Sequence, residues 1–283
     1  MISYKACKIK TLSEFPEYKA QLNSLIENEL GYIFPYHYEV DFYPLMNEKN
    51  HHQLYMLFHQ EKLIGHIGVI KKTIINQSKS IPALFIGGIV IEKSFQGLGL
   101  FKDFFSDVLS KYDDISVKLL WSDKHELYNK FGFYLKGIQY EYQQNTNQQI
   151  YKLKKMSELD ANDKKFLKQS YDTYIQNKIA LSRTDADWEN IFMIESCEVI
   201  FINDVGYAIR NKGMDLNNII HEVCHPELEK NIPSILSYGT LWTTEFIRHF
   251  NPVKQGVALI KLDNEDNQFI LNSPVFIGGV DSI

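Results

Sequence analysis

The fold is decided by residues 84–109, which read LFIGGIVIEKSFQGLGLFKDFFSDVL. The stretch opens with Leu84–Ile91, a short apolar run rich in β-branched residues, which is typical of a strand buried on both faces. A turn that contains Gly97 and Gly99 follows. Beyond the turn, apolar residues recur at helical spacing, at Phe101, Phe104, Phe105, Val108 and Leu109. The stretch therefore predicts a strand, a glycine turn and an amphipathic helix.

This arrangement suits an anionic ligand. The first turn of a helix leaves backbone N–H groups unpaired and carries partial positive charge. Glycines just before it allow positive φ and a close approach of the ligand. The turn is not a Walker loop, because no Gly-Lys-Ser/Thr follows it, and Asp103 and Phe104 stand where a dinucleotide fingerprint has its third glycine. On two glycines alone, an ordinary strand-to-helix turn is the simpler interpretation.

A known family pattern matches this turn. Gln96, Gly99 and the strand before them resemble the Gln/Arg-x-x-Gly-x-Gly/Ala pyrophosphate loop of the GCN5-related N-acetyltransferase superfamily, although Phe101 replaces the last small residue. A second block, Leu127-Tyr128-Asn129-Lys130-Phe131-Gly132-Phe133, follows another predicted strand and resembles the Tyr-x-x-x-Gly-Phe signature of the same superfamily. With both motifs in the right order, residues 1–155 are similar to one acetyltransferase domain.

The resemblance implies a fold and a co-substrate. The fold is α/β, a mixed and mostly antiparallel sheet flanked by helices, whose central strand and next strand splay apart to admit the pantetheine arm of acetyl-CoA. By the same resemblance, backbone groups of Ile89, Val90 and Ile91 would bind the pantetheine amides. The pyrophosphate would lie on the loop made of Gln96, Gly97, Leu98, Gly99, Leu100 and Phe101. Acetyl-CoA is the expected co-substrate, and no metal is expected.

Transfer of an acetyl group to a primary amine needs a proton donor for the thiolate and a proton acceptor for the amine. Tyr128 is the candidate acid, because it heads the second motif and a phenol with a pKa of about 10 is protonated at pH 7. The base is less clear, since Gly87 and Gly88 occupy the central strand where a carboxylate would be convenient. Asp123 is the best carboxylate by position, and a histidine (His37 or His66) or a water chain is an alternative.

The acceptor amine is not identified by the sequence. The aromatic segment 32–46 is interrupted by two prolines and is too apolar for an exposed linker. Packing beneath a loop is its simplest interpretation. The functional hypothesis is that it walls the acceptor pocket, with Tyr36, His37, Tyr38 and Asp41 as substrate-binding residues. A small-molecule amine and a peptide amine both fit this hypothesis.

The second half lacks these motifs but repeats the order of elements. Helices are predicted at 162–178 and 186–195, then strands at 198–202, 206–211 and 218–223, then a helix at 227–238. We therefore predict two domains, a catalytic acetyl-CoA-binding domain at 1–155 and a smaller, degenerate copy at 156–283. Because Cys224-His225-Pro226 stands where the glycine turn would be, the copy is not expected to hold coenzyme A. Segments 133–143 and 149–154 are predicted to form a hairpin.

A rival motif lies in the second half. His221-Glu222-Val223-Cys224-His225 is a literal His-Glu-x-x-His sequence, the pattern of zinc peptidases. Its chemistry needs both imidazoles on one face of a helix. Pro226 disfavours a helix there, and the preceding run is typical of a strand. We interpret the motif as strand residues, with a zinc peptidase as a remote alternative.

Bulk properties restrict the function further. The 283 residues are 45% hydrophobic with a net charge of −5, and the absence of a basic block argues against nucleic acid as a partner. Three widely spaced cysteines suggest no disulfide framework. With no signal-peptide core and no apolar run near 20 residues, we predict a cytoplasmic protein without a membrane partner. A non-catalytic acyl-CoA sensor is the alternative function, and the oligomeric state is open.

Overall fold

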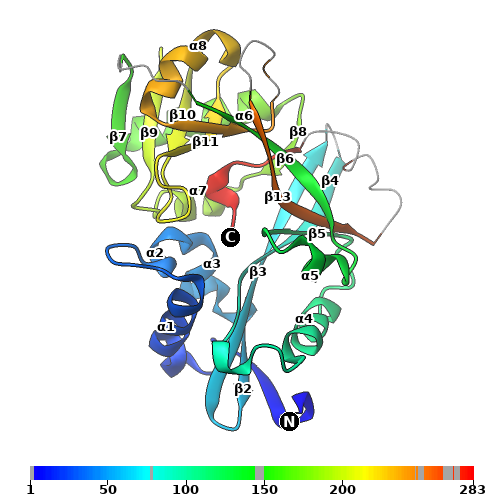
Figure 1. Ribbon diagram of the computed structural model, residues 1–283. Helices are drawn as coiled ribbons and strands as arrows, with labels where there is room; N and C mark the ends of the chain where they lie inside the picture. The colour runs from blue at the N-terminus through cyan, green and yellow to red at the C-terminus, as the bar shows by residue number, and fades with distance from the viewer. Residues whose placement is uncertain are drawn as a thin grey trace.

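The computed structural model describes residues 3–76, 79–143, 150–245, 247, 252–263, 270 and 275–283 (Figure 1). The first half contains the strands β1 (Cys7–Thr11), β2 (Leu54–His59), β3 (Lys62–Asn76), β4 (Lys79–Ile91), β5 (Val117–Trp121) and β6 (Tyr134–Tyr142). Its helices are α1 (Lys19–Leu30), α2 (Tyr38–Asp41), α3 (Tyr43–Met46), α4 (Leu100–Ser110) and α5 (His125–Asn129). The strand, glycine turn and helix predicted for 84–109 are confirmed.

The helices and strands predicted between residues 162 and 238 are present in the predicted order, and the strand β8, which was not predicted, lies between the first two helices. The strands are β7 (Lys152–Lys155), β8 (Ile179–Ser182), β9 (Glu198–Ile202), β10 (Gly206–Arg210), β11 (Ile219–Cys224), β12 (Thr240–Thr243), β13 (Val253–Leu262) and β14 (Val275–Phe276). The helices are α6 (Ala161–Ile175), α7 (Asp185–Ile191) and α8 (Leu228–Ile235). Asp160 and Thr184 cap α6 and α7, because each side chain accepts a backbone N–H of the first helical turn. The mixed α/β class is therefore confirmed.

Helices cover both faces of the first-half sheet. In Figure 1, α1, α2 and α3 lie on one side of β3 and α4 lies on the other. The α4 face is built as the periodicity predicts, with Phe104, Phe105 and Val108 fully buried. Phe101 is only half-buried, and its ring stacks on that of Phe105 at a centroid distance of 5.2 Å. Leu100 takes the buried position at the start of the stripe.

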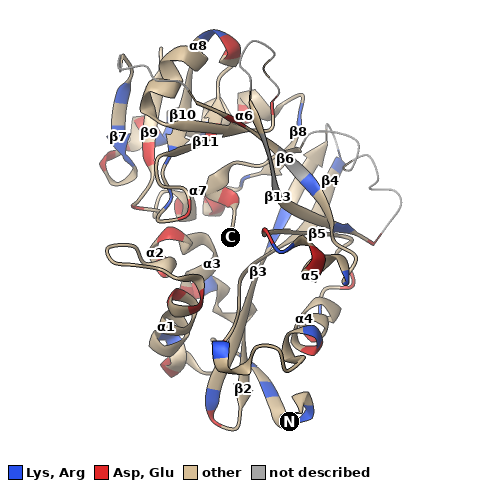
Figure 2. Cartoon of the chain, in the orientation of Figure 1, with Lys and Arg blue, Asp and Glu red and all other residues tan. Residues whose placement is uncertain are grey.

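The sheet continues from one half into the other. Among the described residues its main path runs β1-β2-β3-β4-β5-β13-β6-β12-β11-β10-β9-β7. The strand β13, late in the sequence, is antiparallel to both β5 and β6 and lies between them. The division into domains at residue 155 stays a prediction. Charged residues of both signs are interspersed over the two halves (Figure 2).

One predicted pairing is wrong. Segments 133–143 and 149–154 do not form a hairpin, because β6 pairs with β12 and β13 whereas β7 pairs with β9. The polar run 144–148, which suggested a tight turn, lies outside the described residues. Pairing with distant strands outweighed the local turn signal here. In the part of the chain that the structure describes, every helix falls short of the length and apolarity that a membrane crossing requires.

Candidate active site

The central strands β4 and β5 separate partway along their length. They pair in parallel from Ala83↔Val117 to Ile86↔Leu120. Beyond Ile86, β4 runs on to Ile91 and continues to pair with β3. The β5-facing edge of β4 therefore has no ladder with β5 over residues 87–91. This is the splay that the resemblance implies, and it includes the three residues predicted to bind the pantetheine arm.

The loop after β4 leads directly into the start of α4. Gly97 and Gly99 have left-handed backbone conformations, with φ of +75° and +82°, and Gly99 is the residue that precedes the helix. No described side chain caps this helix start. A methyl group at either glycine would meet no other atom of the described chain within 4 Å. The loop therefore presents main-chain N–H groups at an open, positively polarised helix end, which fits a diphosphate.

Gln96 anchors the beginning of this loop. Its side-chain Nε2 donates to the Ile91 carbonyl oxygen at 2.8 Å and to Glu29 Oε2 at 3.1 Å. Glu29 Oε1 also accepts the backbone N–H of Lys93 at 2.9 Å. Gln96 therefore ties the loop to the end of β4 and to α1, so its side chain holds the shape of the loop. The predicted role of the loop in binding pyrophosphate stays a prediction.

Tyr128 lies on α5, at the end of the separated strands. Its side chain is buried, with 5% of its surface exposed, and packs against Phe101, Phe105 and Phe133. Burial raises the pKa of Tyr128 to about 12; a hydrogen bond with Ser122 lowers it and the charge of Asp123 raises it. The phenol is therefore protonated at pH 7, as a proton donor requires. Asp123 is exposed at the carboxyl end of β5, near Tyr128.

The four residues predicted to bind the acceptor amine form two pairs that differ in burial. Tyr38 and Asp41, both on α2, are buried with 1% and 2% of their surface exposed. The Tyr38 ring stacks on Phe42, and Asp41 Oδ1 accepts the Ser196 hydroxyl at 2.7 Å. Tyr36 is half-buried and His37 is exposed. Burial raises the pKa of Asp41, although the Ser196 hydrogen bond and the charge of Lys212 lower it. Substrate binding by these residues stays a prediction.

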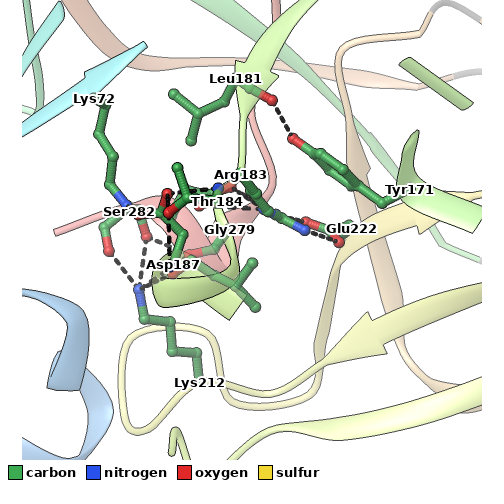
Figure 3. Close-up of polar contacts among 12 residues, drawn as sticks. Lys72, Tyr171, Leu181, Arg183, Thr184, Asp187, Lys212, Glu222, Gly279 and Ser282 are labelled. Atoms are coloured by element: carbon green, nitrogen blue, oxygen red, sulfur yellow. Dashed lines mark hydrogen bonds and ion pairs between the residues drawn. The ribbon is translucent and has the colours of Figure 1, made fainter. Parts of the chain in front are cut away.

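The closing segment (Gly278–Ile283) was missed by the sequence analysis. Figure 1 shows it in red between the two halves. The Lys212 Nζ donates to the Gly279 carbonyl at 3.0 Å and also to the Ser282 carbonyl (Figure 3). At its end, the main chain of Ile283 lies against β4, since a methyl group added at Gly87 would be 2.1 Å from the Ile283 carbonyl carbon. The second half thus holds this segment against the point where β4 leaves β5.

A buried ion cluster fixes the closing segment to the second half. Arg183 Nη2 lies 2.6 Å from Asp281 Oδ2 and 2.5 Å from Glu222 Oε2, and all three side chains have at most 1% of their surface exposed. The guanidinium also lies 3.9 Å from the Tyr171 ring centre. Burial lowers the pKa of Arg183, but the carboxylates of Asp281 and Glu222 outweigh it and raise the pKa well above its ordinary value.

The His-Glu-x-x-His residues are strand residues, as predicted. His221 and Glu222 lie on β11, and His225 follows its end. The Glu222 carboxylate is bound by Arg183 and by the Tyr207 hydroxyl at 2.6 Å, so it is not free to act as a base. The His221 Nε2 lies 2.8 Å from the Asn211 carbonyl oxygen. Among the described residues, no three His, Cys, Asp or Glu side chains are grouped to hold a metal ion.

Stability is expected to fall as the pH decreases from about 6.5 to about 4. Burial lowers the pKa of His66 and of His221 from 6.5 to about 4, so in this interval the unfolded chain binds protons that the folded protein does not. At about 1.4 kcal/mol for each pH unit, each histidine removes roughly 3 kcal/mol by pH 4. Urea denaturation between pH 7.5 and 4.5 measures this. The double variant His66→Gln/His221→Gln should show a flatter dependence; an unchanged slope would contradict the assignment.

No protein-family model matches the sequence, and no curated protein matches it. Comparison of structures defines the class: the chain has the fold of the GCN5-related N-acetyltransferases. It is similar to such an enzyme from Anabaena variabilis ATCC 29413, with a TM-score of 0.65, 15% identity and coverage of 91% of this chain and 73% of that one. The enzyme from Kribbella flavida matches with a TM-score of 0.65 and 10% identity, and the match covers 90% of this chain and 72% of that one. Saccharomyces cerevisiae N-myristoyltransferase with bound myristoyl-CoA matches with a TM-score of 0.58 and 11% identity, and the match covers 93% of this chain and 81% of that one.

Proposed function

We propose that the protein is an acyl-CoA-dependent N-acyltransferase that moves an acetyl group from acetyl-CoA directly to a primary amine. The observation that carries this proposal is the separation of β4 from β5 beside an uncapped helix start with two left-handed glycines. Among the described strands, β4 has no ladder on its β5-facing edge beyond Ile86, and this edge suits a linear amide-containing arm. The helix start offers N–H donors for its diphosphate. The solved structures with this fold include one in complex with an acyl-CoA.

Each step of the reaction has a candidate group in this site. The amine nitrogen attacks the thioester carbon, a C–N bond forms and the C–S bond breaks. A main-chain N–H near Val90 or Ile91 steadies the oxyanion, and Tyr128 donates its proton to the departing thiolate. Asp123 is the proposed acceptor of the amine proton. It is exposed and close enough to Tyr128 to raise the pKa of the phenol.

The direct test combines binding and transfer. Calorimetry with acetyl-CoA should show saturable binding, and incubation with acetyl-CoA and a panel of amines should release free thiol. The panel should contain aminoglycosides, polyamines, amino acids and lysine-containing peptides. No heat with acetyl-CoA would remove the proposal altogether.

A second candidate function is an acyl-CoA sensor without catalysis. It is favoured by one observation: the central strand has Gly87 and Gly88 at the splay, where an added side chain would collide with Ile283, Tyr38 or His66, so neither position carries a carboxylate. Tight binding of acetyl-CoA without thiol release for any amine would support this second function and exclude the first.

Replacing Gly99 with alanine is expected to weaken acetyl-CoA binding by about 10-fold. A Cβ meets no neighbour there, but φ of +82° is a strained conformation for alanine, so relief of the strain (about 1–2 kcal/mol) moves the N–H groups of the loop. Gly31→Ala is the matched control, because Gly31 ends α1 with φ of +74° and similar open space. Both variants should lose similar stability, and calorimetry should show weakened binding for Gly99→Ala alone.

A further inference from the structure

The separation of β4 from β5 coincides with a β-bulge in β4. On the β3 side, Gly68 pairs with Gly87 and His66 pairs with Val90, so two residues of β4 oppose one residue of β3 between these pairs. The first of these two β4 residues is Gly88, whose φ of +58° is in the left-handed region. A bulge bends its strand and increases its twist. The last residue of β4 that pairs with β5 is Ile86, two positions before Gly88.

The Gly88 carbonyl oxygen in this bulge is bound by a side chain. His66 Nδ1 lies 2.7 Å from it, and because a carbonyl can only accept, Nδ1 carries the proton and donates. The His66 side chain is completely buried, and burial lowers its pKa to about 4, so the imidazole is neutral at pH 7. Nε2 is then an acceptor, and it has no hydrogen-bond partner among the residues that the structure describes.

Side chains pack closely against the bulge on the side where α2 lies. A methyl group added at Gly88 would lie 2.9 Å from the Tyr38 hydroxyl oxygen and 3.0 Å from the His66 ring. Tyr38 is itself fixed by stacking on Phe42. The imidazole is therefore held in one place between β3 and β4. Its hydrogen bond to the Gly88 carbonyl lies at the register shift between β3 and β4.

We propose that His66 is a positioning residue for the thioester arm: its N–H holds the Gly88 carbonyl and thereby the bulge that directs β4 away from β5. This inference rests on the proposed function, because the opened edge of β4 is where the arm of acetyl-CoA would bind. In this proposal His66 acts through the backbone of β4 and not on the reacting atoms. The bulge residue and the histidine together set the width of the splay.

The test compares substitutions that keep or remove the donor. His66→Leu fills a similar volume without an N–H, and His66→Gln retains an N–H donor for the Gly88 carbonyl. We expect His66→Leu to weaken acetyl-CoA binding at least 10-fold and to raise the KM for acetyl-CoA, with the KM for the amine within about twofold of wild type. His66→Gln should recover most of the affinity. Amide hydrogen exchange over residues 87–91 should be faster in His66→Leu, with or without coenzyme.

His221→Leu is the matched control. His221 is also buried, its pKa is also lowered to about 4, and it also binds a main-chain carbonyl, that of Asn211, at 2.8 Å. It should lose a similar amount of thermal stability without loss of acetyl-CoA affinity. If His66→Leu does not fold, Gly88→Ala is a second variant, since it disturbs the bulge and keeps the imidazole; it should weaken acetyl-CoA binding to a similar extent.

The outcomes separate the inference from the proposed function. A wild-type protein that does not bind acetyl-CoA overturns both. The inference alone is overturned if the wild type binds acetyl-CoA and transfers the acetyl group, but His66→Leu has the same acetyl-CoA affinity and the same amide hydrogen exchange over residues 87–91. Equal loss of affinity in His66→Leu and His221→Leu also overturns it, because a general loss of stability then explains both.

Discussion

Replacing Tyr128 with phenylalanine is expected to lower kcat for acetyl transfer by about 100-fold, with acetyl-CoA affinity unchanged. The substitution removes one oxygen and keeps the ring that packs against Phe101, Phe105 and Phe133. The thiolate would then depart without a proton donor. Since the pKa of Tyr128 is raised to about 12, its deprotonation contributes no alkaline decline of the rate below about pH 11. Steady-state kinetics and calorimetry with acetyl-CoA measure the two effects separately.

Tyr112→Phe is the control for this prediction. Tyr112 belongs to the same apolar cluster, is also 5% exposed, and its hydroxyl is 2.8 Å from that of Tyr55. Loss of a buried hydroxyl costs about 1 kcal/mol at either position. Only Tyr128→Phe should lower kcat. A Tyr128→Phe enzyme with kcat within threefold of wild type would exclude this tyrosine as the acid.

Replacing Arg183 with leucine is expected to destabilise the fold by about 3–5 kcal/mol. The guanidinium is the shared partner of Glu222 and Asp281, and the variant leaves both carboxylates buried without a cation. Urea denaturation measures the loss. The closing segment should also detach, because Asp281 is one of its anchors, so amide exchange over residues 279–282 should become faster. Arg183→Lys should lie in between, because an ammonium cannot form the same paired contacts.

An exposed ion pair provides the comparison. Lys168 Nζ lies 2.7 Å from Asp185 Oδ1, but Asp185 has 88% of its side-chain surface exposed. Lys168→Met should therefore change the free energy of unfolding by about 0–1 kcal/mol. If Arg183→Leu costs no more than Lys168→Met, the buried cluster does not hold the closing segment as described.

Local signals were sufficient for most elements of the fold. The run 84–91 is continuously apolar, the stripe on α4 has a clear helical period, and β9 has the predicted bounds of Glu198–Ile202. The strand β8 was missed because Ile179–Ser182 is short and begins soon after α6, which ends at Ile175. The hairpin of β6 with β7 was wrongly predicted because their true partners, β12, β13 and β9, lie far away in sequence. Periodicity reports which face is buried but does not identify the partner strand.

In the candidate site, too, the residues in contiguous motifs could be predicted, whereas contacts between distant positions could not. The glycine turn and the Tyr128 block are contiguous motifs, so the sequence could point to them. In the ion cluster, Arg183 is 39 positions before Glu222 and 98 positions before Asp281, and no local sequence pattern connects these residues. One signal was available: the chain has only three arginines among thirty basic residues, and arginine is favoured where one cation must bind buried carboxylates. The His66–Gly88 contact had no signal, since it depends on the register of β3 against β4.

The position of β13 has a consequence for synthesis of the protein on the ribosome. Residues 253–262 lie between β5 and β6, which end at Trp121 and Tyr142. While the intervening residues are being translated, these two strands have emerged without their common partner, and their open edges can pair with other nascent chains. The sheet of the first half is therefore completed only late in translation, when residues 253–262 have been made.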